Sequence, residues 1–78
     1  MSTKNIYDLT VLIYWFDPNK KRQTATERFC SRYKEPAAIE VNETNFHRLK
    51  TKKYAKYNIR IEKVLKFKAV GTWEERKD

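Results

Sequence analysis

A chain of 78 residues is long enough for one domain and too short to carve a deep active-site cleft without losing stability. Its residues are 40% hydrophobic and 14% aromatic, with one glycine and two prolines, which excludes a disordered chain. The formal net charge of +8 favours a partner that is a polyanion or an acidic protein.

The first expected element is a strand over residues 6–16, where β-branched and aromatic residues follow one another. Alternate residues from Tyr7 to Trp15 are apolar, and most of the residues between them are apolar too. A strand of this kind is either central and covered on both faces, or covered by another copy of the chain. The second face is therefore a candidate surface for a homodimer or for a partner.

A tight turn is expected at Asp17-Pro18-Asn19-Lys20, because proline presets φ at the first central position and asparagine tolerates the second. A second strand over residues 23–33 then completes an antiparallel hairpin with a polar and basic outer face. Pro36 ends the pairing, since proline has no N–H to donate.

Residues 37–41 are expected to be extended and to supply an optional further strand. A helix is expected over residues 43–53, with Asn42 as its N-cap and Phe46 and Leu49 buried. Apolar and polar residues alternate over 57–69, which predicts a half-buried strand that ends at Gly71. The tail over residues 72–78 is expected to fray, with Trp73 docked on the domain.

These elements predict a single α+β domain over residues 1–78. Its sheet is small and antiparallel, with three or four strands in the order β-β-(β)-α-β and one helix packed on one face. The single cysteine, Cys30, excludes an internal disulfide and favours the cytoplasm. The apolar run near the N-terminus is too short to span a bilayer and lacks a signal-peptide cleavage site, so no membrane association is expected.

Catalysis has little support in the residue content. One histidine (His47), one cysteine and scattered carboxylates do not form a metal site, and one glycine excludes a glycine-rich phosphate loop. RNA cleavage by Lys, Arg and Tyr side chains over residues 52–60 is a minor alternative, because the same residues suit simple binding. We therefore expect no enzyme, no metal and no cofactor.

Positive charge is concentrated in two stretches, which sum to +5 over residues 19–34 and to +8 over residues 45–68. Single-stranded nucleic acid is bound by cations along its backbone and by rings under its bases, and residues 50–60 interleave both kinds. Five of the cations are expected on one open sheet face: Arg28, Arg32, Arg60, Lys66 and Lys68. The candidate nucleic-acid-binding residues are Lys20, Lys21, Arg22, Arg28, Arg32, Arg48, Lys50, Lys52, Lys53, Tyr54, Lys56, Arg60, Lys66 and Lys68. The candidate stacking or partner-binding residues are Tyr14, Trp15, Phe16 and Trp73.

Together these features favour a small, non-catalytic, cytoplasmic regulator that binds nucleic acid, with RNA or single strands preferred to duplex DNA. The alternative is an inhibitor or antitoxin-like protein, of the kind that phages encode, that blocks a larger acidic or nucleic-acid-handling protein. Exposed aromatic residues beside arginines serve either function. A lysine-rich surface that only maintains solubility is the third interpretation.

Overall fold

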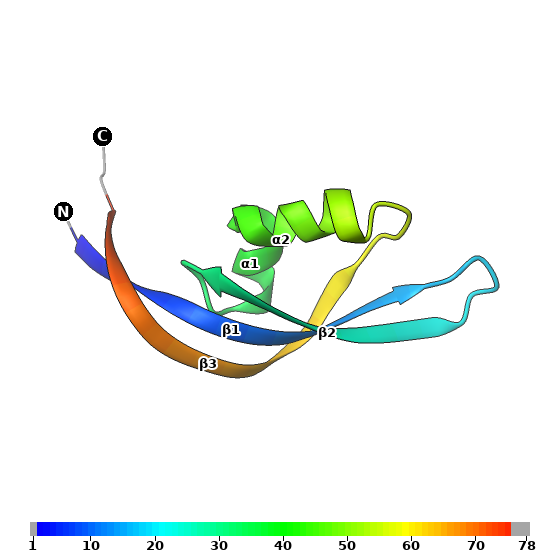
Figure 1. Cartoon of the computed structure of the whole chain (residues 1–78), viewed down its shortest axis with the longest axis horizontal. Coiled ribbons are helices and arrows are strands. Elements are labelled where there is room, and N and C mark those ends of the chain that lie inside the picture. Colours follow the sequence, from blue (N-terminus) through cyan, green and yellow to red (C-terminus); the bar gives the residue numbers. More distant parts are fainter. Residues whose placement is uncertain (1, 76–78) are drawn as a thin grey trace.

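The computed structural model describes residues 2–75 as a curved sheet with its helices gathered on one side (Figure 1). The sheet has three strands in the order β2-β1-β3, and both pairings are antiparallel. The elements in chain order are β1 (Ser2–Phe16), β2 (Arg22–Ser31), α1 (Pro36–Asn42), α2 (Thr44–Arg48), the π-helical turn η1 (Leu49–Lys53) and β3 (Arg60–Glu75). The α+β class is confirmed, but two short helices replace the single helix, and no fourth strand lies within residues 2–75.

The hairpin of β1 and β2 follows the expectation closely, with β1 as the central strand. At its tip, one carboxylate oxygen of Asp17 accepts hydrogen bonds from the backbone N–H groups of Asn19 and Lys21, both at 2.9 Å. Lys20 completes the turn with φ at 62°, in the left-handed region, where a side chain costs about 1 kcal/mol. The Asp17 side chain therefore holds a turn that Lys20 alone disfavours.

The extended segment expected over residues 37–41 is wrong, because these residues belong to α1. Pro36 occupies the first turn of this helix, where its missing N–H would have no partner in any case. Ala37 and Ala38 follow, and alanine has the highest helix propensity. Proline thus ends the β2 segment by starting a helix.

The helix expected over residues 43–53 ends where predicted but begins differently. Glu43, not Asn42, is the N-cap of α2, and its side chain accepts from the Asn45 N–H. The last turn is a π-helix: the Tyr54 N–H donates to the Leu49 carbonyl at 2.9 Å, five residues earlier. Phe46 is buried as expected, whereas Leu49 is only half-buried.

The last strand differs most from its prediction. It begins at Arg60, so Tyr57 precedes it, and it continues through Gly71 to Glu75, pairing with the first residues of β1. The expected fraying is therefore wrong for residues 72–75, and residues 76–78 lie outside the described part. The register with β1 shifts at three places, which leaves Glu62, Leu65 and Val70 without a partner residue. Such β-bulges bend a strand, and β3 is visibly curved (Figure 1).

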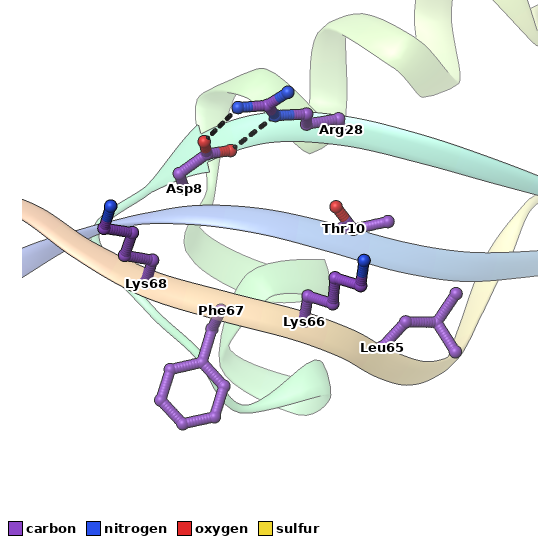
Figure 2. Close-up of a pocket in the computed structure, with 7 residues that line it drawn as sticks. All are labelled: Asp8, Thr10, Arg28, Leu65, Lys66, Phe67 and Lys68. Carbon is purple, nitrogen blue, oxygen red and sulfur yellow. Dashed lines mark hydrogen bonds and ion pairs between the residues drawn. The ribbon is translucent and has the colours of Figure 1, made fainter.

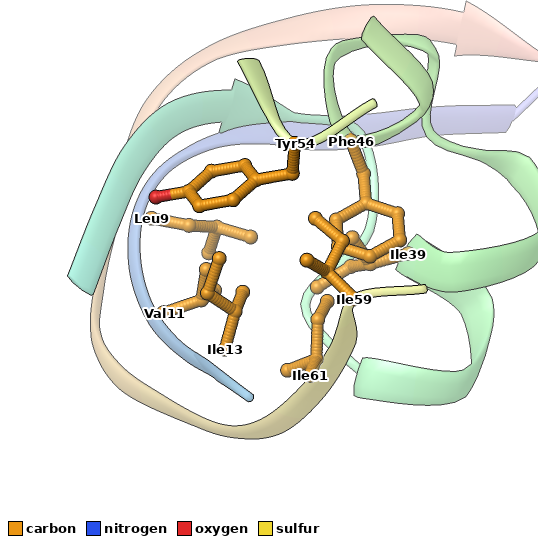
Figure 3. Close-up of a cluster of buried hydrophobic side chains, with 8 residues drawn as sticks. All are labelled: Leu9, Val11, Ile13, Ile39, Phe46, Tyr54, Ile59 and Ile61. Atoms are coloured by element: carbon orange, nitrogen blue, oxygen red, sulfur yellow. The ribbon is translucent and has the colours of Figure 1, made fainter. Parts of the chain in front are cut away.

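The core lies between the sheet and the helices (Figure 3). Alternate residues of β1 supply its floor, and the two α-helices and the segment after η1 supply its roof. The opposite face of the sheet is covered by no other element of residues 2–75 (Figure 1). The core residues are Leu9, Val11, Ile13, Ile39, Phe46, Tyr54, Ile59 and Ile61.

Candidate nucleic-acid interface

The structure does not gather the five expected cations in one place. Arg28, Lys66 and Lys68 line one hollow on the uncovered face. Arg32 instead lies over the ring of Trp73, 4.6 Å from its centroid, so Trp73 is docked as expected. The Nε of Arg60 donates to Glu40 of α1 at 3.0 Å. The expected grouping of five cations therefore does not form. Arg32 follows the end of β2 and lines a hollow beside α2, and Arg60, although it pairs with Tyr14, is bound to Glu40 at the sheet edge.

The hollow on the open face has a volume of about 640 Å³ and contains a carboxylate (Figure 2). Asp8 accepts two hydrogen bonds from Arg28, at 3.0 and 2.5 Å. These bonds, with the nearby charge of Lys68, hold the pKa of Asp8 below its usual value. Asp8 is therefore ionised at neutral pH and offsets part of the charge of this hollow. The hollow is lined by Asp8, Thr10, Arg28, Leu65, Lys66, Phe67 and Lys68.

On the helix side, two adjoining hollows of about 340 and 290 Å³ share Asn45 and Arg48. We call them together the β2–α2 groove. Cations of both basic stretches meet here, Arg32 from the first and Arg48 and Lys52 from the second. The first hollow is lined by Arg32, Tyr33, Asn42, Glu43, Thr44, Asn45 and Arg48, and the second by Phe29, Asn45, Arg48, Leu49, Lys52 and Lys53.

Hydrogen bonds between the end of β2 and α2 hold this groove in shape. The amide of Asn45 donates to the Cys30 carbonyl at 2.6 Å. The buried carboxylate of Glu43 accepts from the Ser31 hydroxyl at 2.9 Å and from the Arg32 N–H at 3.0 Å. Glu43 faces the groove, but its oxygens are already used by donors of the protein.

Lys53 and Tyr54 are bound to Glu27 of β2. The Lys53 ammonium lies 2.9 Å from a Glu27 oxygen, and the Tyr54 hydroxyl donates to the same oxygen. Burial opposes ionisation of Glu27, but the two hydrogen bonds outweigh it and lower its pKa. Burial and the neighbouring carboxylate raise the pKa of Tyr54 to about 12. Lys53 is therefore paired, and the buried ring of Tyr54 does not offer the stacking face expected of it.

Three groove cations form no ion pair with a described carboxylate: Arg32, Arg48 and Lys52. All three are exposed. Residues 44–58 contain no acidic residue, so little negative charge lies along this part of the chain. The β2–α2 groove therefore combines three cations that lack a described carboxylate partner with an apolar floor formed by Phe29 and Leu49.

The other candidates are spread over the molecule. Arg22 pairs with Glu62 and lies over the Tyr14 ring, 4.8 Å from its centroid. Trp15 packs on Tyr57, with ring centroids 5.3 Å apart, on the helix side of the sheet. Lys20 and Lys21 lie at or beside the hairpin turn, Phe16 is exposed at the end of β1, Lys50 is half-buried on η1 and Lys56 is exposed after it.

The sequence analysis names the cations of the groove but not its uncharged lining. Phe29, which also packs against the core, and Asn45 both line the second hollow and were not among the candidate site residues. Asn45 lies three residues before Arg48, a spacing that puts two side chains on one helix face. That spacing was the only available signal.

Within the described range, no three His, Cys, Asp or Glu side chains gather as a possible metal site. None of the helices found there is long and apolar enough to cross a membrane. No protein-family model matches this sequence, and no match is found among curated proteins or among solved structures.

Proposed function

We propose that this protein binds single-stranded nucleic acid, RNA in the first place, in the β2–α2 groove. One observation carries the proposal: the two basic stretches meet there, and Arg32, Arg48 and Lys52 remain without a described carboxylate partner. The open-face hollow also has three cations, but Asp8 lies among them.

The groove suits a flexible strand. Arg32 and Arg48 line the first hollow and Arg48 and Lys52 the second, so phosphates can follow the cations from one hollow to the next. Arginine can bind a phosphate through two parallel N–H groups. The half-buried Phe29 ring at the floor offers an apolar surface to an unpaired base. A base held inside a duplex does not expose its face in this way, which supports the preference for single strands.

The test compares two variants with the same net charge, Arg48→Glu/Lys52→Glu in the groove and Lys66→Glu/Lys68→Glu on the open face. A labelled single-stranded RNA and a duplex DNA of equal length are titrated at several salt concentrations. Three phosphate contacts predict a slope of log K against log salt of about −2, at roughly 0.7 per contact. We expect the groove variant to lose more than tenfold in RNA affinity and about 1.4 of this slope, because two contacts are reversed.

The open-face variant is the matched control, because all four residues are exposed and both variants lower the net charge equally. We expect the RNA affinity of this open-face variant to fall less than threefold. Equal losses in the two variants would show that only overall charge matters and would contradict the proposal. Circular dichroism of both variants checks that they are folded.

The alternative function, blocking of a larger protein, is supported by a different surface. Leu65, Phe67 and Val70 of β3 are exposed apolar residues, which is unusual for three neighbours on one strand. In either case we propose a non-catalytic regulator in the cytoplasm, where the exposed thiol of Cys30 would stay reduced.

A further inference from the structure

The outer edge of β3 combines apolar residues with an unpaired strand edge. β3 has β1 as its only neighbour in the sheet, so its other edge is free within the described chain. Leu65, Phe67 and Val70 on this strand are 44%, 58% and 53% exposed. Exposed hydrophobic residues in such a row often mark a contact surface.

The β-bulges account for two of these residues. Leu65 and Val70 are extra residues in the register with β1, so their side chains have no cross-strand partner. Bulges commonly re-aim a side chain in this way. Phe67 contacts the Tyr7 ring edge-on at 6.0 Å, and in Figure 2 its ring points away from β1, off the outer side of β3. All three apolar residues are thus exposed on the same edge strand.

Positive charge flanks this apolar row. Lys63, Lys66 and Lys68 pair with β1 residues of the open face, are exposed and form no ion pair with a described carboxylate. Phe67 pairs with Leu9, so it belongs to the opposite face, where the Lys34 ammonium lies 5.4 Å from its ring. Along this edge, one face therefore presents lysines and the other an aromatic ring.

The backbone of the same edge is free only beyond its first residues. The Ile61 N–H donates to Glu40 of α1 at 2.6 Å, so α1 occupies the beginning of the outer edge. No described side chain bonds the backbone between Lys63 and Val70. This part can accept hydrogen bonds from an added strand, and donate to it.

The alternation of lysines and apolar residues along β3 indicates which kind of partner fits its outer edge. A second copy of the chain would bring its own lysines against these, and lysines on an edge strand disfavour pairing between two like edges. A nucleic acid would satisfy the lysines but not Leu65 and Val70. We propose that the outer edge of β3 binds an extended acidic segment of a partner protein, with carboxylates toward the lysines and apolar side chains toward Phe67. This surface shares no residue with the β2–α2 groove, so the two proposals fail separately.

The test selects peptides from a displayed random library on the wild-type protein, with counter-selection on Leu65→Ser/Phe67→Ser. We expect the enriched peptides to alternate acidic and apolar residues. A labelled peptide of this kind is then measured by fluorescence anisotropy. Its affinity should fall at least fivefold in Leu65→Ser/Phe67→Ser, and remain unchanged in Phe16→Ser, where an equally exposed ring is removed at the hairpin.

Hydrogen exchange locates the peptide. Backbone amides between residues 63 and 70 should exchange more slowly when it is bound, and an analogue with alternate N-methylated amides should lose this protection and its affinity. Failure to enrich acidic peptides would overturn the proposal. So would a dimer in sedimentation velocity that the Leu65→Ser/Phe67→Ser variant abolishes, or protection of the same amides by single-stranded RNA.

Discussion

The β2–α2 groove and the open-face hollow are built from similar side chains, yet they differ in how their carboxylates are placed. In the open hollow, the Asp8 carboxylate accepts hydrogen bonds from Arg28 and lines the hollow together with Lys66 and Lys68. In the groove, Glu43 accepts hydrogen bonds from the Ser31 hydroxyl and the Arg32 backbone N–H, and the side chains of Arg32, Arg48 and Lys52 remain unpaired with any described carboxylate. The charge of a segment therefore matters less for binding than which of its cations lack a partner across the fold.

The largest expected effect removes the support beneath the groove. Phe46 is buried under α2, so Phe46→Ala should lower the free energy of unfolding by about 3–5 kcal/mol. Thr10→Ala, in the open hollow, should change it by less than about 0.5 kcal/mol. Urea denaturation measures both. Similar losses would show that the two hollows depend equally on the core.

The two carboxylates provide the second comparison. Glu43→Ala leaves the Ser31 hydroxyl and the Arg32 N–H without their partner, and should lower the free energy of unfolding by about 2–3 kcal/mol. Asp8→Ala should lower stability much less, because the Arg28 side chain of this pair is largely exposed and water screens the interaction. A loss from Asp8→Ala as large as that from Glu43→Ala would contradict this difference.

The third prediction concerns pH and the Glu27–Tyr54 pair beside the groove. The pKa of Tyr54 is raised to about 12 in the folded protein, against 10.0 ordinarily, so the protonated hydroxyl is favoured by folding. This contribution is complete below about pH 10 and is lost as the pH rises toward about 12, with a magnitude on the order of 1–2 kcal/mol.

Urea denaturation over this pH range should show the loss, and Tyr54→Phe should show less of it because the titrating hydroxyl is absent. Tyr14→Phe is the control, since Tyr14 lies on the other side of the sheet. Identical pH profiles for Tyr54→Phe and wild type would exclude Tyr54 as the source.

The smallest expected effect tests the comparison of the two hollows most directly. Glu27→Gln releases Lys53 into the groove and should raise the affinity for single-stranded RNA about twofold to fivefold, the size of one partly screened charge contact. Asp8→Asn releases Arg28 on the open face and should leave the affinity for single-stranded RNA unchanged. A larger gain in RNA affinity from Asp8→Asn than from Glu27→Gln would indicate that the binding site lies on the open face.

Much of this fold follows from local sequence, and the parts that do not were missed for two different reasons. The hairpin, its Asp17 turn and the buried Phe46 depend on neighbouring residues, and they are found as expected. The helix at Pro36 was missed because proline both ends strands and begins helices, and its position alone does not say which.

The bulges of β3 were missed for a different reason. Alternation continues past Leu65 in the sequence, but the register with β1 slips there and exposes that residue. The ion pairs also depend on the assembled fold, since Asp8 meets Arg28 only after β1 and β2 are aligned, and Glu40 meets Arg60 only after α1 packs beside β3. The division of cations into paired and unpaired ones is therefore a property of strand register and helix packing, which the order of residues does not reveal.

The ladder between β1 and β3 runs to Ser2 and Glu75, which lie opposite each other. A connection between these two positions would span only the width of one strand pair, about 5 Å between Cα atoms. The chain could then be reopened at the hairpin tip, where Lys20 would be released from its left-handed backbone. Such a circular permutant would leave both the groove and the β3 edge intact.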